Sequence, residues 1–135
     1  MTRRDELLAL ADRVEAATGA DTLLDALVSA AVNDAVLEVQ DGCRAAFHSA
    51  DGARWVSVPV LPYTASIDAA LTLVPSGWRI HTGDFTIRDW SMAADCESAT
   101  ATVIGRDGPE HGHASTPALA ITAAALRALA QETPE

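Results

Sequence analysis

The chain has no lysine: its nine basic residues are all arginines, and they face 19 acidic residues. The formal net charge is −10 and the sequence pI is about 4.6. A nucleic-acid groove needs clustered cations to neutralise phosphates, so we expect no direct DNA binding. The acids are spread along the chain rather than gathered in one block, which favours a role in solubility. An acidic face that docks on a basic partner is the alternative.

Cysteines and long apolar runs are also scarce. Cys43 and Cys96 are the only two cysteines, they lie far apart, and neither belongs to a CxxC pair. Such thiols are typical of a reducing compartment. No apolar run approaches the roughly 18 residues that span a bilayer. The N-terminal arginines are followed by acids instead of an apolar signal segment. We therefore expect a cytoplasmic protein that binds no membrane.

What remains is a composition typical of a globular domain. The hydrophobic fraction is 49% and the charged fraction 21%. A length of 135 residues suits one domain, 1–135, with a buried core of its own.

Apolar residues at helical spacing predict a helix over 3–17 and a second helix that begins after Asp21. We treat 1–32 as an N-terminal helical extension. A third helix is predicted from a cap at Thr64 or Ser66 to about Val74. The last helix starts at Thr116, with Pro117 in its first position, and ends near Ala130. Its alanines, among them Ala120, Ala123, Ala124 and Ala128, would let it lie close to a sheet.

The remaining segments indicate strands. Asp51-Gly52 between two short apolar stretches predicts a hairpin, which Pro59 and Pro62 then end. Residues 35–39 are either a strand or the tail of the second helix. Residues 78–82 and 85–90 are either a hairpin or one bent strand. Residues 99–104 are rich in threonine, valine and isoleucine, which favours a strand, and 110–114 could return beside them. The fold class is therefore α+β: an antiparallel sheet of four or five strands sandwiched by helices, with an N-terminal helical pair.

Two segments resemble a known family. Tyr63-Thr-x-Ser-x-Asp-Ala-Ala-x-x-Leu-Val-Pro-x-Gly-Trp78 and the later Ala-x-Thr-Pro-Ala-Leu-Ala-Ile, which begins at Ala114, are similar to the phage ABA-sandwich domain of small bacteriophage and prophage proteins. The resemblance covers roughly 60–130. It implies a sheet between helical layers and a phage or prophage origin, and it carries no catalytic residues. The helical extension and the hairpin with Phe47 and Trp55 lie outside it.

The same region predicts a binding site for an anion. The helix starts near Ser66 and Thr116 offer free N–H groups and a favourable dipole. Arg79, Arg88 and Arg106 could complete such a site, and Tyr63, Trp78 and Trp90 could stack on a base. The candidate ligand-binding residues are Tyr63, Thr64, Trp78, Arg79, Arg88 and Thr116. The competing interpretation is structural, with capping hydroxyls, core aromatics and solvated arginines.

Catalytic and metal-binding patterns are weak. His111-Gly-His113 would place two imidazoles on one face of a strand, but a third ligand would have to be guessed among Glu110, His81 and His48. His113-Ala-Ser115 matches a single element of the two-histidine phosphoesterases, which need two. There is no Gly-x-Ser-x-Gly motif, and neither cysteine has an activating neighbour. We expect no enzyme activity, no metal and no cofactor.

We therefore expect a small phage accessory protein that acts by binding in the cytoplasm of the host cell. By analogy with anti-defence sponges, it would sequester a nucleotide-derived immune signal. The alternatives are an acidic module that inhibits a host protein and a minor structural phage protein. The apolar stripe of the first two helices predicts a homo-oligomer.

Overall fold

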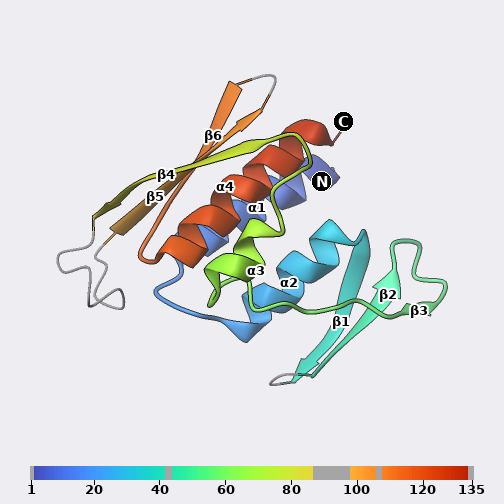
Figure 1. Cartoon of the computed structure of the whole chain (residues 1–135). Coiled ribbons are helices and arrows are strands. Elements are labelled where there is room, and N and C mark those ends of the chain that lie inside the picture. The colour runs from blue at the N-terminus through green and yellow to red at the C-terminus, as the bar shows by residue number, and fades with distance from the viewer. Residues whose placement is uncertain (1, 42–43, 87–97, 106–107, 134–135) are drawn as a thin grey trace.

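The structure is a computed structural model, and it describes residues 2–41, 44–86, 98–105 and 108–133. In chain order the elements are α1 (Arg3–Ala16), α2 (Thr22–Val32), β1 (Ala35–Asp41), β2 (Arg44–Ser49), β3 (Trp55–Val56), α3 (Ile67–Leu71), β4 (Arg79–Thr86), β5 (Ser98–Gly105), β6 (Gly108–Ala114) and α4 (Pro117–Glu132) (Figure 1). The predicted α+β class and the N-terminal helical pair are confirmed.

Polar caps fix the starts of the helices. Thr2 and Asp5 form a capping box on α1, and the Asp21 carboxylate accepts the N–H groups of Leu23 and Leu24 at the start of α2. Thr116 caps α4 as predicted. At α3 the cap is Ser66, whose hydroxyl accepts the N–H of Ala69. The helix is only five residues long and ends before the predicted Val74.

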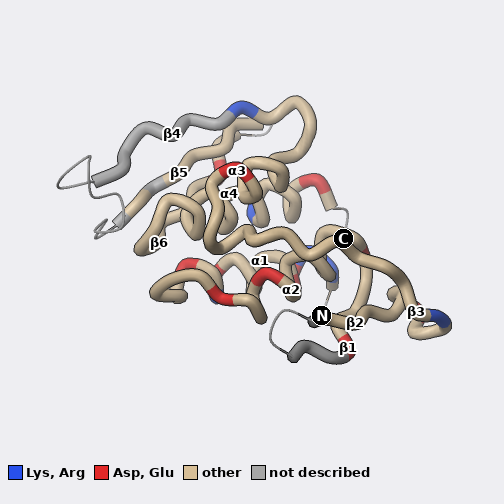
Figure 2. The backbone as a smooth tube through the Cα atoms, turned by 60° about the horizontal axis from the view of Figure 1, so that its bottom comes forward, with Lys and Arg blue, Asp and Glu red and all other residues tan. Residues whose placement is uncertain are grey.

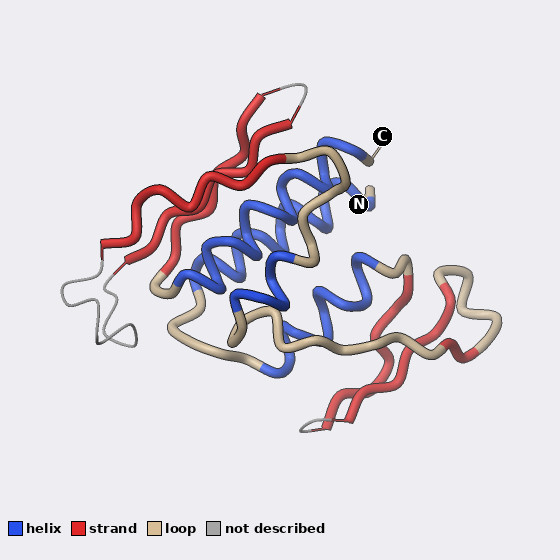
Figure 3. Tube along the Cα trace, viewed as in Figure 1, coloured by secondary structure: helices blue, strands red, loops and turns tan. Residues whose placement is uncertain are grey.

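The strands form two separate three-stranded antiparallel sheets (Figure 3). The structure thus differs from the predicted single sheet of four or five strands. The small sheet has the order β1-β2-β3, and the large sheet has the order β4-β5-β6. Pro59 follows β3 closely and cannot donate to a ladder, so the small sheet ends there. The chain then passes to α3 before the large sheet begins.

Residues 79–86 form one strand, because the irregularity between His81 and Asp84 is absorbed within β4. This matches the alternative of a bent strand. Residues 35–41 are a strand rather than a tail of α2, and Asp34 before them has a positive φ of 53°. The predicted Asp51-Gly52 hairpin is present, with β2 paired to β3. Residues 87–90 of the predicted second strand lie outside the described residues.

The centre of the molecule is a helix and not a sheet. α4 packs against β5, β6, α1 and α3 (Figure 1). Eleven of its 16 residues are buried, most of them alanines. The four alanines predicted to allow close packing are all fully buried. The inner face of β5, formed by Ala99, Ala101 and Val103, covers one side of α4, and the opposite face exposes Ile104.

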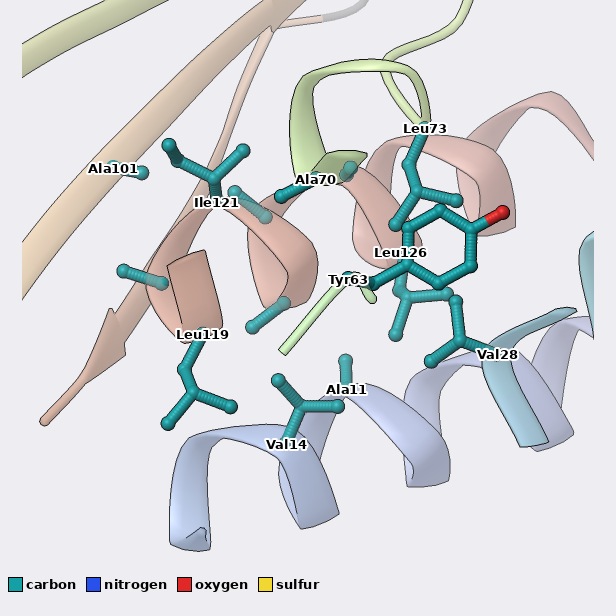
Figure 4. Close-up of a cluster of buried hydrophobic side chains, with 14 of the residues drawn as sticks. Ala11, Val14, Val28, Tyr63, Ala70, Leu73, Ala101, Leu119, Ile121 and Leu126 are labelled. Carbon is teal, nitrogen blue, oxygen red and sulfur yellow. The ribbon is translucent and has the colours of Figure 1, made fainter. Parts of the chain in front are cut away.

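Each sheet has its own hydrophobic cluster. The main cluster joins α1, α2, α3 and α4 to the inner face of the large sheet, and Figure 4 shows its centre. A smaller cluster holds the small sheet to α2 through Ala26, Ala30 and Phe47. Among the described helices, α2 makes the principal contact with the small sheet, through β1, and packs on one face of that sheet.

Candidate functional site

Tyr63 and Thr64, two of the predicted ligand-binding residues, belong to the interior. Their exposed fractions are 4% and 2%. The ring of Tyr63 lies among Val28, Leu73 and Leu126 (Figure 4). Burial raises the pKa of the Tyr63 phenol, and a hydrogen bond with Ser29 acts in the opposite direction. A ring enclosed in this way has no open face for a base.

Thr64 is the centre of a buried polar connection between α2 and the segment before α3. Its hydroxyl donates to Asp25 Oδ1 at 2.8 Å and accepts the Asp21 N–H at 2.9 Å. Its own N–H donates to Asp25 Oδ1 at 2.9 Å. Asp25 is 6% exposed, so these bonds satisfy a buried carboxylate. The hydroxyl predicted to contact a ligand or cap a helix instead joins two elements.

Thr116 lies beside Thr64 in space. Both line a hollow of about 370 Å³ near the starts of α3 and α4, together with Ala20, Ala65, Ile67, Pro117 and Ala118. The Thr116 hydroxyl accepts the Leu119 N–H at 3.3 Å, which is its role as a cap. The structure therefore brings the two threonines together, as part of a mostly apolar surface.

Trp78 and Arg79 lie at the other end of α4. The Trp78 indole donates its N–H to Glu132, the last residue of α4, at 2.7 Å. At about 1.5 Å per residue, the 16 residues of α4 place that end roughly 24 Å from Thr116. The indole also packs on Gly105, where any Cβ would meet the ring. The carboxylate beside Trp78 disfavours a phosphate there, while Arg79 is exposed.

Five of the six predicted ligand-binding residues are thus divided into an interior pair, a helix cap and a separate Trp78–Arg79 pair. Arg88, together with Arg106 and Trp90, lies outside the described residues. Ligand binding by these residues stays a prediction.

The two histidines of β6 make contacts that belong to the fold. His111 Nδ1 lies 3.1 Å from the Thr102 hydroxyl, which is its neighbour in register on β5. His113 is exposed, and its backbone N–H donates to Glu15. Within the described ranges, no three His, Cys, Asp or Glu side chains gather closely enough to hold a metal ion. The side chain of His81 is not described.

An ionic clamp covers the outer edge of β6. Arg127 of α4 donates to Glu15 of α1 at 2.8 Å and to Asp12 at 3.0 Å. It also donates to the His111 carbonyl at 2.6 Å, and Glu15 accepts the His113 N–H at 2.7 Å. The hydrogen bond with Arg127 is the main reason that the pKa of Glu15 is lowered, and the same bond raises the pKa of Arg127. The clamp therefore occupies backbone groups that an edge strand otherwise leaves open.

Sequence reasoning missed this clamp. Arg127 is 112 residues from Glu15 and 115 from Asp12, and Glu15 is 98 residues from His113. Nothing in their local patterns connects them. Many other acids also have a local partner, and Figure 2 shows them on several elements instead of one acidic face. Examples are Asp34 with Arg3 at 3.5 Å and Asp51, whose pKa is lowered by the Ser49 hydroxyl.

The outer face of the small sheet carries the two most exposed large apolar side chains in the described part of the chain. In register, Val36, His48 and Trp55 form one row across β1, β2 and β3. Val36 is 48% exposed and Trp55 is 61% exposed. The rings of His48 and Trp55 stack with centroids 3.8 Å apart. His48 Nε2 lies 3.5 Å from Glu38 Oε2.

The neighbouring residues on the opposite face of the same strands are buried or partly buried instead of exposed. There Leu37, Phe47 and Val56 pack toward α2, with Phe47 only 3% exposed. The sequence predicted the hairpin around Asp51-Gly52. It did not reveal which face would remain open, because that depends on α2.

No protein-family model matches this chain, and neither the curated proteins nor the solved structures include a significant match. The resemblance to the phage ABA-sandwich domain stays a prediction. None of the helices in the described ranges is long and apolar enough to cross a membrane.

Proposed function

We propose that this chain is a small binding protein, not an enzyme, and that it recognises another protein through the outer face of its small sheet. The observation that carries the proposal is the row of Val36, His48 and Trp55, in which a tryptophan is 61% exposed on a face that α2 leaves open. Tryptophan is enriched among the residues that dominate protein–protein affinity.

The row is well suited to binding because its aromatic part is held in place. His48 stacks on Trp55 and lies beside Glu38, so the indole has a supported face and an open face. A side chain that is already ordered loses less conformational entropy when it binds. The polar residues of the α4 region have structural tasks instead, as the Thr64 connection and the Arg127 clamp illustrate.

The wider setting of the proposal rests on the resemblance. A phage accessory protein would meet its partner in the cytoplasm of a bacterial host, and inhibition of a host protein is the role that we favour. The nucleotide sponge needs the Trp78–Arg79 end of the molecule, where Glu132 holds the indole. The homo-oligomer stays a prediction, although the apolar stripe of α1 and α2 that suggested it packs within the main cluster of the chain itself.

Photo-crosslinking tests the proposal directly. A photoreactive amino acid replaces Trp55 in one variant and Leu8 in a control, since Leu8 is a second exposed apolar residue at 36%. Both variants are irradiated in the bacterial cells that express them. We expect a discrete protein adduct from position 55 and none from position 8. Equal adducts from both positions, or no adduct from position 55, would remove the small sheet from the role.

A further inference from the structure

An apolar groove runs beside the small sheet, between α1 and β1. Ala9 and Leu10 form one wall, Leu27 and Ala31 of α2 contribute the floor, and Val36 and Leu37 form the other wall. Its volume is about 370 Å³, which is within the range of pockets that bind small ligands. The groove is partly open to solvent, so a segment of another chain can reach its walls.

The β1 wall of the groove offers backbone hydrogen-bonding groups. β1 is the edge of its sheet. Ser49 donates its N–H to the Arg54 carbonyl at 2.9 Å, toward β3. Successive residues of a strand direct their backbone groups to alternate sides, so His48 directs its groups toward β1, where Val36 is its partner.

It follows that Val36 bonds to β2, while Ala35 and Leu37 direct their N–H and C=O groups to the free edge. In the described part of the chain, no backbone hydrogen bond from outside the small sheet reaches either residue. The corresponding edge of β6 is closed by Glu15 and Arg127. Among the described contacts, no such closure is present at Ala35 and Leu37 on the free edge of β1.

We infer that the groove binds a single extended segment of a partner protein, which adds to β1 as a further strand and places alternate apolar side chains on α2. This inference rests on the proposed function and names how the partner is held. Recognition by strand addition combines backbone hydrogen bonds with pockets for alternate side chains. The groove supplies both on adjacent walls.

Two observations favour a foreign segment over a second copy of this chain. First, α1 bounds the groove opposite β1, so a strand that already belongs to a sheet would meet that wall. Second, copies that each carry a net charge of −10 repel one another. Glu6 and Arg13 of α1, two helical turns apart, also line the groove. They favour a segment with a basic residue toward Glu6 and an acidic residue toward Arg13.

The test uses a displayed library of short random peptides selected against the full chain. We expect the enriched peptides to alternate apolar and polar residues. Ala9→Trp, which fills the groove from an exposed position of α1, should weaken them by at least about tenfold, equivalent to about 1.4 kcal/mol. Leu8→Trp, at the adjacent exposed position that does not line the groove, is the matched control and should not weaken them.

Hydrogen exchange on the same complex reports the mode of binding. The Leu37 amide should exchange more slowly when the peptide is bound, and the Val36 amide should change little because it already bonds to β2. Failure to enrich alternating peptides, equal binding by Ala9→Trp, or an unchanged Leu37 amide would overturn the inference. The proposed function is tested separately by the photo-crosslinking experiment, and it fails if position 55 yields no protein adduct.

Discussion

Gly112 is a residue of β6 that packs directly against the backbone of α4. A Cβ at this position would fall on the Ala120 carbonyl and within 2.8 Å of the Ala124 nitrogen, both of them backbone atoms that cannot move aside. The glycine therefore sets the distance between β6 and α4. The sequence predicted that the alanines of α4 would permit close packing, but it gave no sign that Gly112 was the facing residue.

Gly112→Ala should lower the free energy of unfolding by about 1–3 kcal/mol, because the added methyl group overpacks the helix–strand contact. Urea denaturation measures the change. Gly19→Ala is the matched control, since nothing lies within 4 Å of its Cβ position, and it should change stability by less than about 0.5 kcal/mol. Equal effects of the two substitutions would show that β6 does not approach α4 this closely.

Thr64 bonds to Asp25 of α2, a contact that its sequence context did not indicate. Thr64→Val keeps the shape of the side chain and removes the hydroxyl that serves both Asp21 and Asp25. We expect a loss of about 1–3 kcal/mol, because buried polar groups then lose partners. Thr72→Val, at an exposed position with one local hydrogen bond, should cost less than about 0.5 kcal/mol. Thermal unfolding of both variants checks this, and a Thr64→Val protein of unchanged stability would return Thr64 to the list of ligand residues.

At the scale of elements, local patterns predicted most of the helices and strands. Apolar spacing predicted α1, capping residues marked the starts of α2 and α4, and Asp51-Gly52 marked the β2–β3 hairpin. The division into two sheets was not predictable in this way. It depends on which strands α4 and α2 cover, and that is decided by contacts between residues far apart in the chain.

The Arg127 clamp makes the stability of the fold depend on pH. Because the folded-state pKa of Glu15 is lowered, its contribution to stability is fully present above the ordinary value of 4.5 and is lost as the pH falls through the folded-state pKa. Glu15→Gln should therefore be less stable than wild type at neutral pH, and the difference should shrink as the pH falls below 4.5. Unfolding measured over that range tests the sign. Glu6→Gln, on the same helix but outside the clamp, is the control, and a difference that grows in acid would contradict this account.

At the scale of the whole molecule, the charge of −10 is dispersed over elements that use many of their acids for caps and clamps. A partner bound through Val36 and Trp55 would be held mainly by apolar contacts. We expect its affinity to fall only modestly from low to high ionic strength, since salt screens charges and not apolar contacts. Titration calorimetry at several salt concentrations measures this. A steep fall would favour the acidic docking module instead.

The composition predicted a globular domain. The described residues of the predicted single site are divided between the interior and the two ends of α4. The exposure of Val36 and Trp55 depends on the tertiary structure, because α2 covers one face of the small sheet and not the face that carries these two residues. This is why the region outside the family resemblance, and not the region within it, carries the proposed function.

The most direct test of the central claim is native mass spectrometry of material purified from bacterial cells, comparing the wild type with Trp55→Ala and Arg79→Ala. Both substitutions change exposed side chains. We predict that the wild type and Arg79→Ala retain a bound protein and that Trp55→Ala loses it. A nucleotide-sized adduct that Arg79→Ala loses and Trp55→Ala keeps would contradict the account and assign the function to the Trp78–Arg79 end.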